Sequence, residues 1–156
     1  MQEHPIDVGH RLEIAILHHL TQRGYEVLLP SGFNHRYNLV IDAGDRFVRA
    51  QCKTGRLRDG TVVFNTWSVR SNTRGAKARA YDGEADVFLV YCAELQSVYA
   101  VPIRDAPCRD MRLRVRPAAN GQTKRVGWAR EFELDGSAAL LGAPRLGPVR
   151  RSSSAG

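Results

Sequence analysis

Cysteine is scarce in this 156-residue chain, and the few cysteines do not form a recognisable framework. Cys52, Cys92 and Cys108 are widely spaced, odd in number and without a Cys-X-X-Cys motif. That pattern fits reduced thiols in a cytosol better than a set of disulfides or a zinc site. We therefore expect a cytoplasmic protein.

Long apolar runs are also missing. No run approaches the roughly 18 residues that span a bilayer, and the polar N-terminus with Pro5 does not resemble a signal peptide. The hydrophobic fraction of 43% is ordinary for a globular chain with one core. With no internal repeat, we expect a single domain over residues 1–142, no membrane association, and a disordered tail over 143–156.

Acidic residues are nearly absent from two stretches. Asp59 is the only acid among nine Lys and Arg between Arg46 and Arg79. A second basic stretch, residues 104–130, contains arginines at alternate positions from Arg112 to Arg116. Together with a net charge of +7, this distribution suits a polyanionic partner. A solvated basic face is the alternative interpretation.

The first regular element is a predicted helix over residues 7–23. Asp7 can act as its N-cap, and Gly24 occupies the C′ position that favours glycine. Helical spacing places Glu13 beside the apolar stripe rather than opposite it. The residues expected to form that stripe are Val8, Ile14, Leu17 and Leu20.

Most of the remaining elements are predicted strands. Alternating or apolar segments separated by turn residues give strands over 25–29, 37–42, 46–54, 61–66, 86–92 and 97–102. Residues 67–79 have no clear period and are interpreted as a loop, and residues 128–134 as a short helix or strand. These elements predict an α/β fold with a mixed central sheet flanked by helices.

A predicted hairpin in the first half of the chain carries the residues that could form a catalytic site. Alternation puts Gln51 and Lys53 on one face of their strand and Cys52 on the core face. A turn at residues 43–45 brings Asn38 close to Gln51, and Glu13 could complete the cluster. Phosphodiester hydrolysis uses such groups, because Mg²⁺ prefers oxygen ligands and a lysine can stabilise charge on phosphate oxygens. Polar residues on an exposed hairpin face are the alternative.

The chain resembles the PD-(D/E)XK nuclease superfamily, and within it the small endonucleases associated with group I introns. The resemblance covers roughly residues 7–134 and rests on an ordered series of segments rather than on one motif. These segments are Gly9 with Glu13, RGYEVLLP at 23–30, RYNLVID at 36–42, RAQCKTGR at 49–56, DG at 59–60, YDGEADVFLVYC at 81–92, VYAVPI at 98–103, the Leu113 region and ANGQ at 119–122.

This resemblance implies an endonuclease that cleaves double-stranded DNA with Mg²⁺, or alternatively Mn²⁺, through a metal-activated water. It implies a metal site formed by Glu13, Asn38 and Gln51, with Lys53 as the fourth catalytic residue. It also implies a homo-oligomer, a dimer or tetramer, since cutting both strands requires two active sites. The residues expected to bind DNA are Arg36, Arg49, Arg56, Arg70, Arg74, Lys77, Arg112 and Arg114.

Asn38 departs from the family pattern, which has an aspartate at this position. An asparagine oxygen can coordinate a cation but brings no charge, so Glu13 becomes the only carboxylate of the site. Asp42 shares a face with Asn38 but lies about 13 Å along the strand, and is interpreted as a turn residue. A non-catalytic DNA-binding protein on the same fold is therefore the rival prediction. A protein-interaction domain would leave the two basic stretches unexplained.

Overall fold

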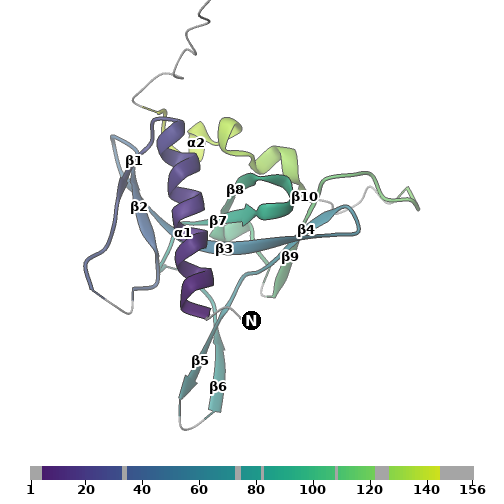
Figure 1. The fold of residues 1–156 in the computed structure, drawn as a ribbon, viewed down its shortest axis with the longest axis horizontal. Coiled ribbons are helices and arrows are strands. Elements are labelled where there is room, and N and C mark those ends of the chain that lie inside the picture. Colours follow the sequence, from purple (N-terminus) through teal and green to yellow (C-terminus); the bar gives the residue numbers. More distant parts are fainter. Residues whose placement is uncertain are drawn as a thin grey trace, which may run out of the picture.

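A long helix lies across a twisted mixed sheet in this computed structural model, which describes residues 5–32, 35–72, 75–81, 83–107, 109–121 and 127–144 (Figure 1). The predicted α/β class is confirmed. The helices are α1 (Pro5–Gln22) and α2 (Ala138–Leu141), and short 3-10 turns occupy Ala93–Leu95, Ile103–Asp105, Ala129–Phe132 and Leu134–Gly136. The strands of the main sheet are β1 (Glu26–Leu28), β2 (Leu39–Asp42), β3 (Phe47–Arg58), β4 (Thr61–Asn65), β7 (Val87–Cys92), β8 (Ser97–Pro102), β9 (Asp110–Arg114) and β10 (Gly127–Trp128).

Strand β3 is the centre of the sheet and has three neighbours. It pairs with β2 over residues 47–50, with β7 over 50–55 and with β4 over 56–58. The β3–β7 and β9–β10 pairs are parallel, and the other pairs are antiparallel. Strand β2 pairs with the first part of β3 and β4 with its last part, and the two lie toward opposite ends of the sheet (Figure 1). Residues 51–55 of β3, between these two parts, pair with β7 alone.

Helix α1 begins and packs somewhat differently from the prediction. It starts at Pro5, so Asp7 lies in its first turn rather than at the N-cap. Its end confirms the predicted C′ glycine: Gly24 has a φ of 80°, and its N–H donates to the Thr21 carbonyl at 3.0 Å. The buried stripe is shifted, since Val8 and Ile14 are exposed. The helix residues in the core are Leu12, Ile16 and Leu20.

Two hydrophobic cores lie on the two faces of the sheet. The alternation predicted for β3 is confirmed, because Val48, Ala50 and Cys52 are buried in the core that packs on α1. The opposite face covers a second core, which includes Val62, Phe88 and Leu113. Gln51 and Lys53 therefore project beside packed residues rather than from a fully solvated hairpin face.

Residues 67–79, predicted as a loop, contain a hairpin. Strands β5 (Ser68–Asn72) and β6 (Gly75–Arg79) pair with each other and with nothing else in the described chain. The hairpin projects away from the main sheet (Figure 1). A two-stranded ribbon needs no core of its own, which is why the segment lacks an apolar period.

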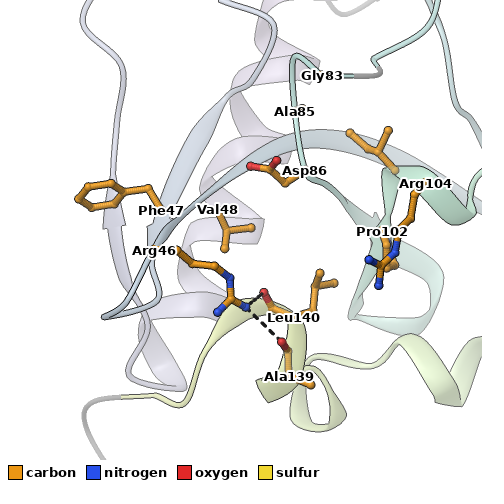
Figure 2. A pocket seen from close by; sticks show the side chains of 11 residues that line it. Arg46, Phe47, Val48, Gly83, Ala85, Asp86, Pro102, Arg104, Ala139 and Leu140 are labelled. Atoms are coloured by element: carbon orange, nitrogen blue, oxygen red, sulfur yellow. Dashed lines mark hydrogen bonds between the residues drawn. The ribbon is translucent and has the colours of Figure 1, made fainter.

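The C-terminal part also carries structure that the weak signal there did not reveal. Residues 110–114 form β9, and residues 127–132 begin as the short strand β10 and continue as a 3-10 turn. Arg46 anchors α2, because its Nη2 donates to the carbonyls of Ala139 at 3.1 Å and Leu140 at 2.8 Å (Figure 2). The predicted disordered tail lies outside the described residues from position 145 onward.

Gly55 marks the place where β3 changes partners from β7 to β4. A Cβ there would stand 2.6 Å from Val62 Cγ1 and 2.9 Å from Val90 Cγ1, and both valines are fully buried. We predict that Gly55→Ala lowers the free energy of unfolding by about 1–3 kcal/mol, because overpacking forces these side chains to shift. Gly9→Ala, at an exposed position of α1 with room for a Cβ, should instead raise the free energy of unfolding by about 0.5–1 kcal/mol. Urea denaturation of both variants measures this, and equal effects would contradict the packing argument.

Candidate active site

The predicted cluster lies at a notch in the edge of β3. Residues 51–55 pair with β7, while β2 ends at residue 50 of β3 and β4 begins pairing at residue 56. Both β2 and β4 use the same edge. On the β2 side, the carbonyl of Ala50 accepts a hydrogen bond from the Asn38 N–H. On the β4 side, Arg58 and Thr61 face each other across the two-residue turn 59–60, so the backbone N–H and C=O of Arg58 point toward β4. Alternate residues of a strand share an edge, so the notch opens between β2 and β4.

Asn38 closes one side of this notch. It immediately precedes Leu39, which pairs with Ala50, so Asn38 lies opposite Gln51 as predicted. Its Oδ1 accepts a hydrogen bond from the Cys52 N–H at 2.8 Å, and its Nδ2 donates to Glu13 Oε1 at 2.5 Å. The structure thus brings together the helix glutamate and the strand asparagine, 25 positions apart in the chain.

These two partners determine the orientation of the Asn38 carboxamide. The reverse orientation would place two donors against each other at Cys52 and two oxygens against each other at Glu13. The asparagine oxygen is therefore already used by the backbone, and one oxygen of the only carboxylate is already hydrogen-bonded. Asp42 plays the predicted turn role, because its Oδ1 accepts from Gly44 N at 2.9 Å.

The donor set suits a divalent cation only weakly. Glu13 supplies one carboxylate, and within the described residues the Gln51 amide oxygen accepts no hydrogen bond, while Gln51 Nε2 makes a long 3.5 Å contact with the Cys52 carbonyl. The part of the chain that is described contains no group of three or more His, Cys, Asp or Glu placed to hold a metal ion. Mg²⁺ is usually held through one or two carboxylates, so this site lies at the lower limit.

Lys53 is held firmly at the other side of the notch. Its Nζ donates to Asn65 Oδ1 at 2.9 Å, to the Trp67 carbonyl at 3.0 Å and to the Tyr81 hydroxyl at 3.4 Å. These three acceptors match the three N–H donors of an ammonium group. The same nitrogen lies 4.8 Å from the Tyr81 ring centre and 5.7 Å from that of Phe88. The charge is thus positioned by aromatic rings as well as by hydrogen bonds.

The surroundings of Lys53 lower the pKa of its ammonium group. Burial and, to a smaller extent, the nearby positive charge of Arg36 together lower the pKa of the Lys53 ammonium to about 8. At neutral pH the group remains predominantly protonated, so it can still donate to an anion. Burial also raises the pKa of the Cys52 thiol, which agrees with the predicted position of this residue on the core face.

Arg36 ties the base of the β5–β6 hairpin to the site. Its guanidinium lies 4.2 Å from the centre of the Tyr81 ring, on which Lys53 also packs. It donates to Ser68 Oγ, at the start of β5, and to the Ala80 carbonyl, just after β6, and it forms an ion pair with Glu84. One arginine therefore fixes both ends of the projecting hairpin beside the lysine.

The residues predicted to bind DNA have different surroundings. Arg36 and Arg49 are engaged within the protein, the latter through Asp86 at 3.0 Å and the Gly83 carbonyl at 3.0 Å. Hydrogen bonding to Arg49 lowers the pKa of Asp86 against the opposing effect of burial. Arg74 and the side chains of Arg70 and Lys77 lie outside what the structure describes.

The other three predicted DNA contacts belong to a different face. Arg56 alternates along β3 with Gly55 and Leu57, which face the second core, so its side chain projects on the face opposite to Lys53. Arg112 and Arg114 flank Leu113 of the same core and share the face of Arg56. They do not converge on the notch.

An open pocket of about 550 Å³ lies elsewhere, at the start of β3 and the end of β8 (Figure 2). None of the predicted site residues lines it.

Within the described ranges, no helix has the length and apolar character needed to cross a bilayer.

The sequence did not reveal which residues contact the side chains of Lys53 and Arg36. Asn65 and Trp67 contact Lys53 from 12 and 14 positions away, and Tyr81 from 28. Tyr81 is 5% exposed and belongs to the second core. Its contact with Lys53 and Arg36 follows from tertiary structure, because no local spacing connects these positions.

The fold and the notch, with its glutamate, amides and lysine, define a protein built like a nuclease. The profile of the PD-(D/E)XK endonuclease family matches residues 3–135, so the chain belongs to that family and is a DNA endonuclease by membership. The predicted resemblance is confirmed at this level. In fold the chain is similar to a bacterial homing endonuclease, I-Ssp6803I, with a TM-score of 0.64 and 22% identity over 85% of this chain and 94% of that one. No curated protein matches the chain significantly.

The Lys53 environment predicts an unusual titration. Nitrogen-detected NMR of the metal-free protein should show the Lys53 ammonium titrating near pH 8, against an ordinary value of 10.5. Arg36→Met should raise this pKa, because it removes the neighbouring positive charge, whereas Arg104→Met, at an exposed position, should not change it. Since the unfolded chain has the higher pKa, the Lys53 contribution to stability should grow as pH rises from about 8 toward 10.5. A Lys53 signal titrating at the ordinary value would contradict this account.

Proposed function

We propose that this protein binds double-stranded DNA and hydrolyses a phosphodiester bond at the β3 notch, slowly because Asn38 replaces the family's aspartate. The observation that carries the proposal is the Lys53 ammonium, which is held by three acceptors. Lys53 lies on the same strand as Gln51, across the notch from the Glu13–Asn38 pair. Family membership supports the same chemistry.

Each residue of the notch has a role in this proposal. Hydrolysis adds a water oxygen to phosphorus and breaks one P–O bond to the adjoining sugar. Mg²⁺, or Mn²⁺, held by Glu13 and the Gln51 amide oxygen would polarise the phosphate and lower the pKa of a water molecule. Lys53 donates to a non-bridging phosphate oxygen, where negative charge grows. Its longest hydrogen bond, 3.4 Å to Tyr81, is the one most readily exchanged for the phosphate.

Asn38 limits this chemistry in two ways. It contributes no charge, and its Nδ2 already donates to one of the two carboxylate oxygens of Glu13. A cation must therefore share the only carboxylate of the site with a hydrogen-bond donor. We expect weak Mg²⁺ binding in the parent protein for this reason.

A DNA-binding protein that has lost cleavage is the second candidate function. The specific observation in its favour is that Asn38 satisfies both Glu13 and the Cys52 N–H without a cation. The retained Lys53 environment favours the enzyme, because a lysine that merely contacted phosphate would not need three protein acceptors.

A homo-oligomer, dimer or tetramer, belongs to the same proposal. Each chain carries one notch, and cleavage of both strands of a duplex requires at least two. The cysteine pattern favours a cytoplasmic protein, with Cys52 and Cys92 both free and buried. Sedimentation of the full chain with and without duplex DNA measures the assembly.

Lys53→Met tests the role of the lysine. The substitution keeps the alkyl packing over Tyr81 and removes the ammonium. We predict that nicking of supercoiled plasmid is lost, by about a hundredfold or more, while duplex affinity changes by less than about threefold. An equal loss of binding and cleavage would instead make Lys53 an ordinary phosphate contact.

Asn38→Asp tests the charge argument. We predict tighter Mg²⁺ binding and at least about tenfold faster nicking, which is about 1.4 kcal/mol of barrier. Without Mg²⁺ the variant should unfold more easily than the parent, because two carboxylates then face each other where Asn38 now donates to Glu13 at 2.5 Å. Titration calorimetry, thermal unfolding and plasmid nicking measure the three effects.

The matched control is Asn120→Asp, which adds the same charge in an exposed turn after β9. It should leave Mg²⁺ binding and nicking unchanged, because it lies away from the notch. An Asn38→Asp protein that binds Mg²⁺ tightly yet cuts nothing would favour the non-catalytic candidate. A parent that already cuts as fast as the variant would show that the asparagine serves as well as a carboxylate.

A further inference from the structure

Four arginines form a grid on the face of the sheet where β3, β4 and β9 pair. The grid consists of Arg56 and Arg58 on β3 and Arg112 and Arg114 on β9. Strand β4 lies between the two pairs, with Val63 in the middle of one row and Thr61 in the middle of the other. The alternate residues Leu57, Val62 and Leu113 belong to the second core, so all four arginines project from the other face.

Within the described residues, no carboxylate forms an ion pair with any arginine of this grid, in contrast to Arg36 and Arg49. Arg58 and Arg112 are exposed. Arg114 is half-buried, and its Nε is buried without an acceptor in the described part of the chain. Glu94 interacts with Arg56 only through longer-range attraction. The positive charge of this face is therefore not neutralised by an ion pair within the described residues.

The spacing of the grid suits a nucleic-acid backbone. Alternate residues of a strand lie about 6.7 Å apart, and positions two strands apart lie about 10 Å apart. Trp128 extends one row, because it pairs with Arg114, and the Arg130 guanidinium lies 5.0 Å from its ring centre. Helix α1 lies over the other half of the sheet, and β4 and β9 extend beyond it (Figure 1).

We propose that this arginine face binds the phosphate backbone of duplex DNA several base pairs away from the step that is cleaved. Arg58 lies five residues beyond Lys53 on β3, a distance of about 17 Å. At 3.4 Å per base pair, that corresponds to about five base pairs from the notch. The inference rests on the proposed function, since it takes the scissile phosphate to lie at Lys53. Because backbone contacts carry no sequence information, the face contributes affinity rather than specificity.

The test is duplex binding as a function of salt concentration. Arg58→Gln and Arg112→Gln, alone and combined, are compared with the parent on a random 24-base-pair duplex. Each substitution should reduce the slope of log K against log salt by about 0.9, and the double variant by about 1.8. Arg104→Gln, an arginine that is 85% exposed elsewhere on the surface, is the matched control and should leave the slope unchanged. Thermal unfolding verifies that the variants fold.

The outcomes separate this inference from the proposed function. A parent that binds duplex DNA, with the parent slope retained in the double variant, would overturn the arginine face alone. An equal drop for Arg104→Gln would show that net charge matters and not this surface. Equal loss of binding to heparin and to duplex would make the face a general polyanion site, and would overturn the assignment to DNA. A parent without duplex binding at low salt would overturn both proposals.

Discussion

The notch in the edge of β3 is the constraint on which the site depends. Between β2 and β4 the strand has a neighbour on one side only, and the Cys52 N–H on the open side needs an acceptor, because an unpaired backbone donor next to a core is costly. Asn38 supplies that acceptor, and its remaining amide group then meets Glu13. An asparagine at this position is thus well suited to the metal-free fold, although the family's chemistry uses a carboxylate there. Stability without a cation and affinity for a cation make opposite demands on residue 38.

A second interaction links the notch to the rest of the molecule. Tyr81, buried against Phe88, carries both Arg36 and Lys53 on its ring. Two positive charges so close together are tolerated because each has oxygen acceptors of its own and Glu84 balances Arg36. The same arginine holds both ends of the β5–β6 hairpin. Arg36 therefore links both ends of the hairpin to the aromatic ring on which the lysine packs.

The positive charge of the chain is divided among three uses. Arg36 and Arg49 hold elements together through Glu84 and Asp86, and Arg46 holds α2 through backbone carbonyls. Lys53 lies at the notch, where Asn65, Trp67 and Tyr81 accept its hydrogen bonds. The four arginines of the grid, Arg56, Arg58, Arg112 and Arg114, have no ion-pair partner among the described residues and lie together on one face. A basic composition alone does not distinguish these uses, because each depends on which acids and carbonyls the fold brings near.

What the sequence determined is local or repeated along the chain. Strand alternation separated Gln51 and Lys53 from Cys52, a turn signal brought Asn38 opposite Gln51, and an ordered series of motifs identified the family. What only the tertiary structure decided are contacts between distant positions. These include the Glu13–Asn38 hydrogen bond, the acceptors of Lys53, and the separation of the β3–β9 arginines from the notch. Side-chain direction along one strand follows from backbone geometry over two residues, whereas these contacts depend on how α1, β4 and the hairpin pack around β3, which no local spacing records.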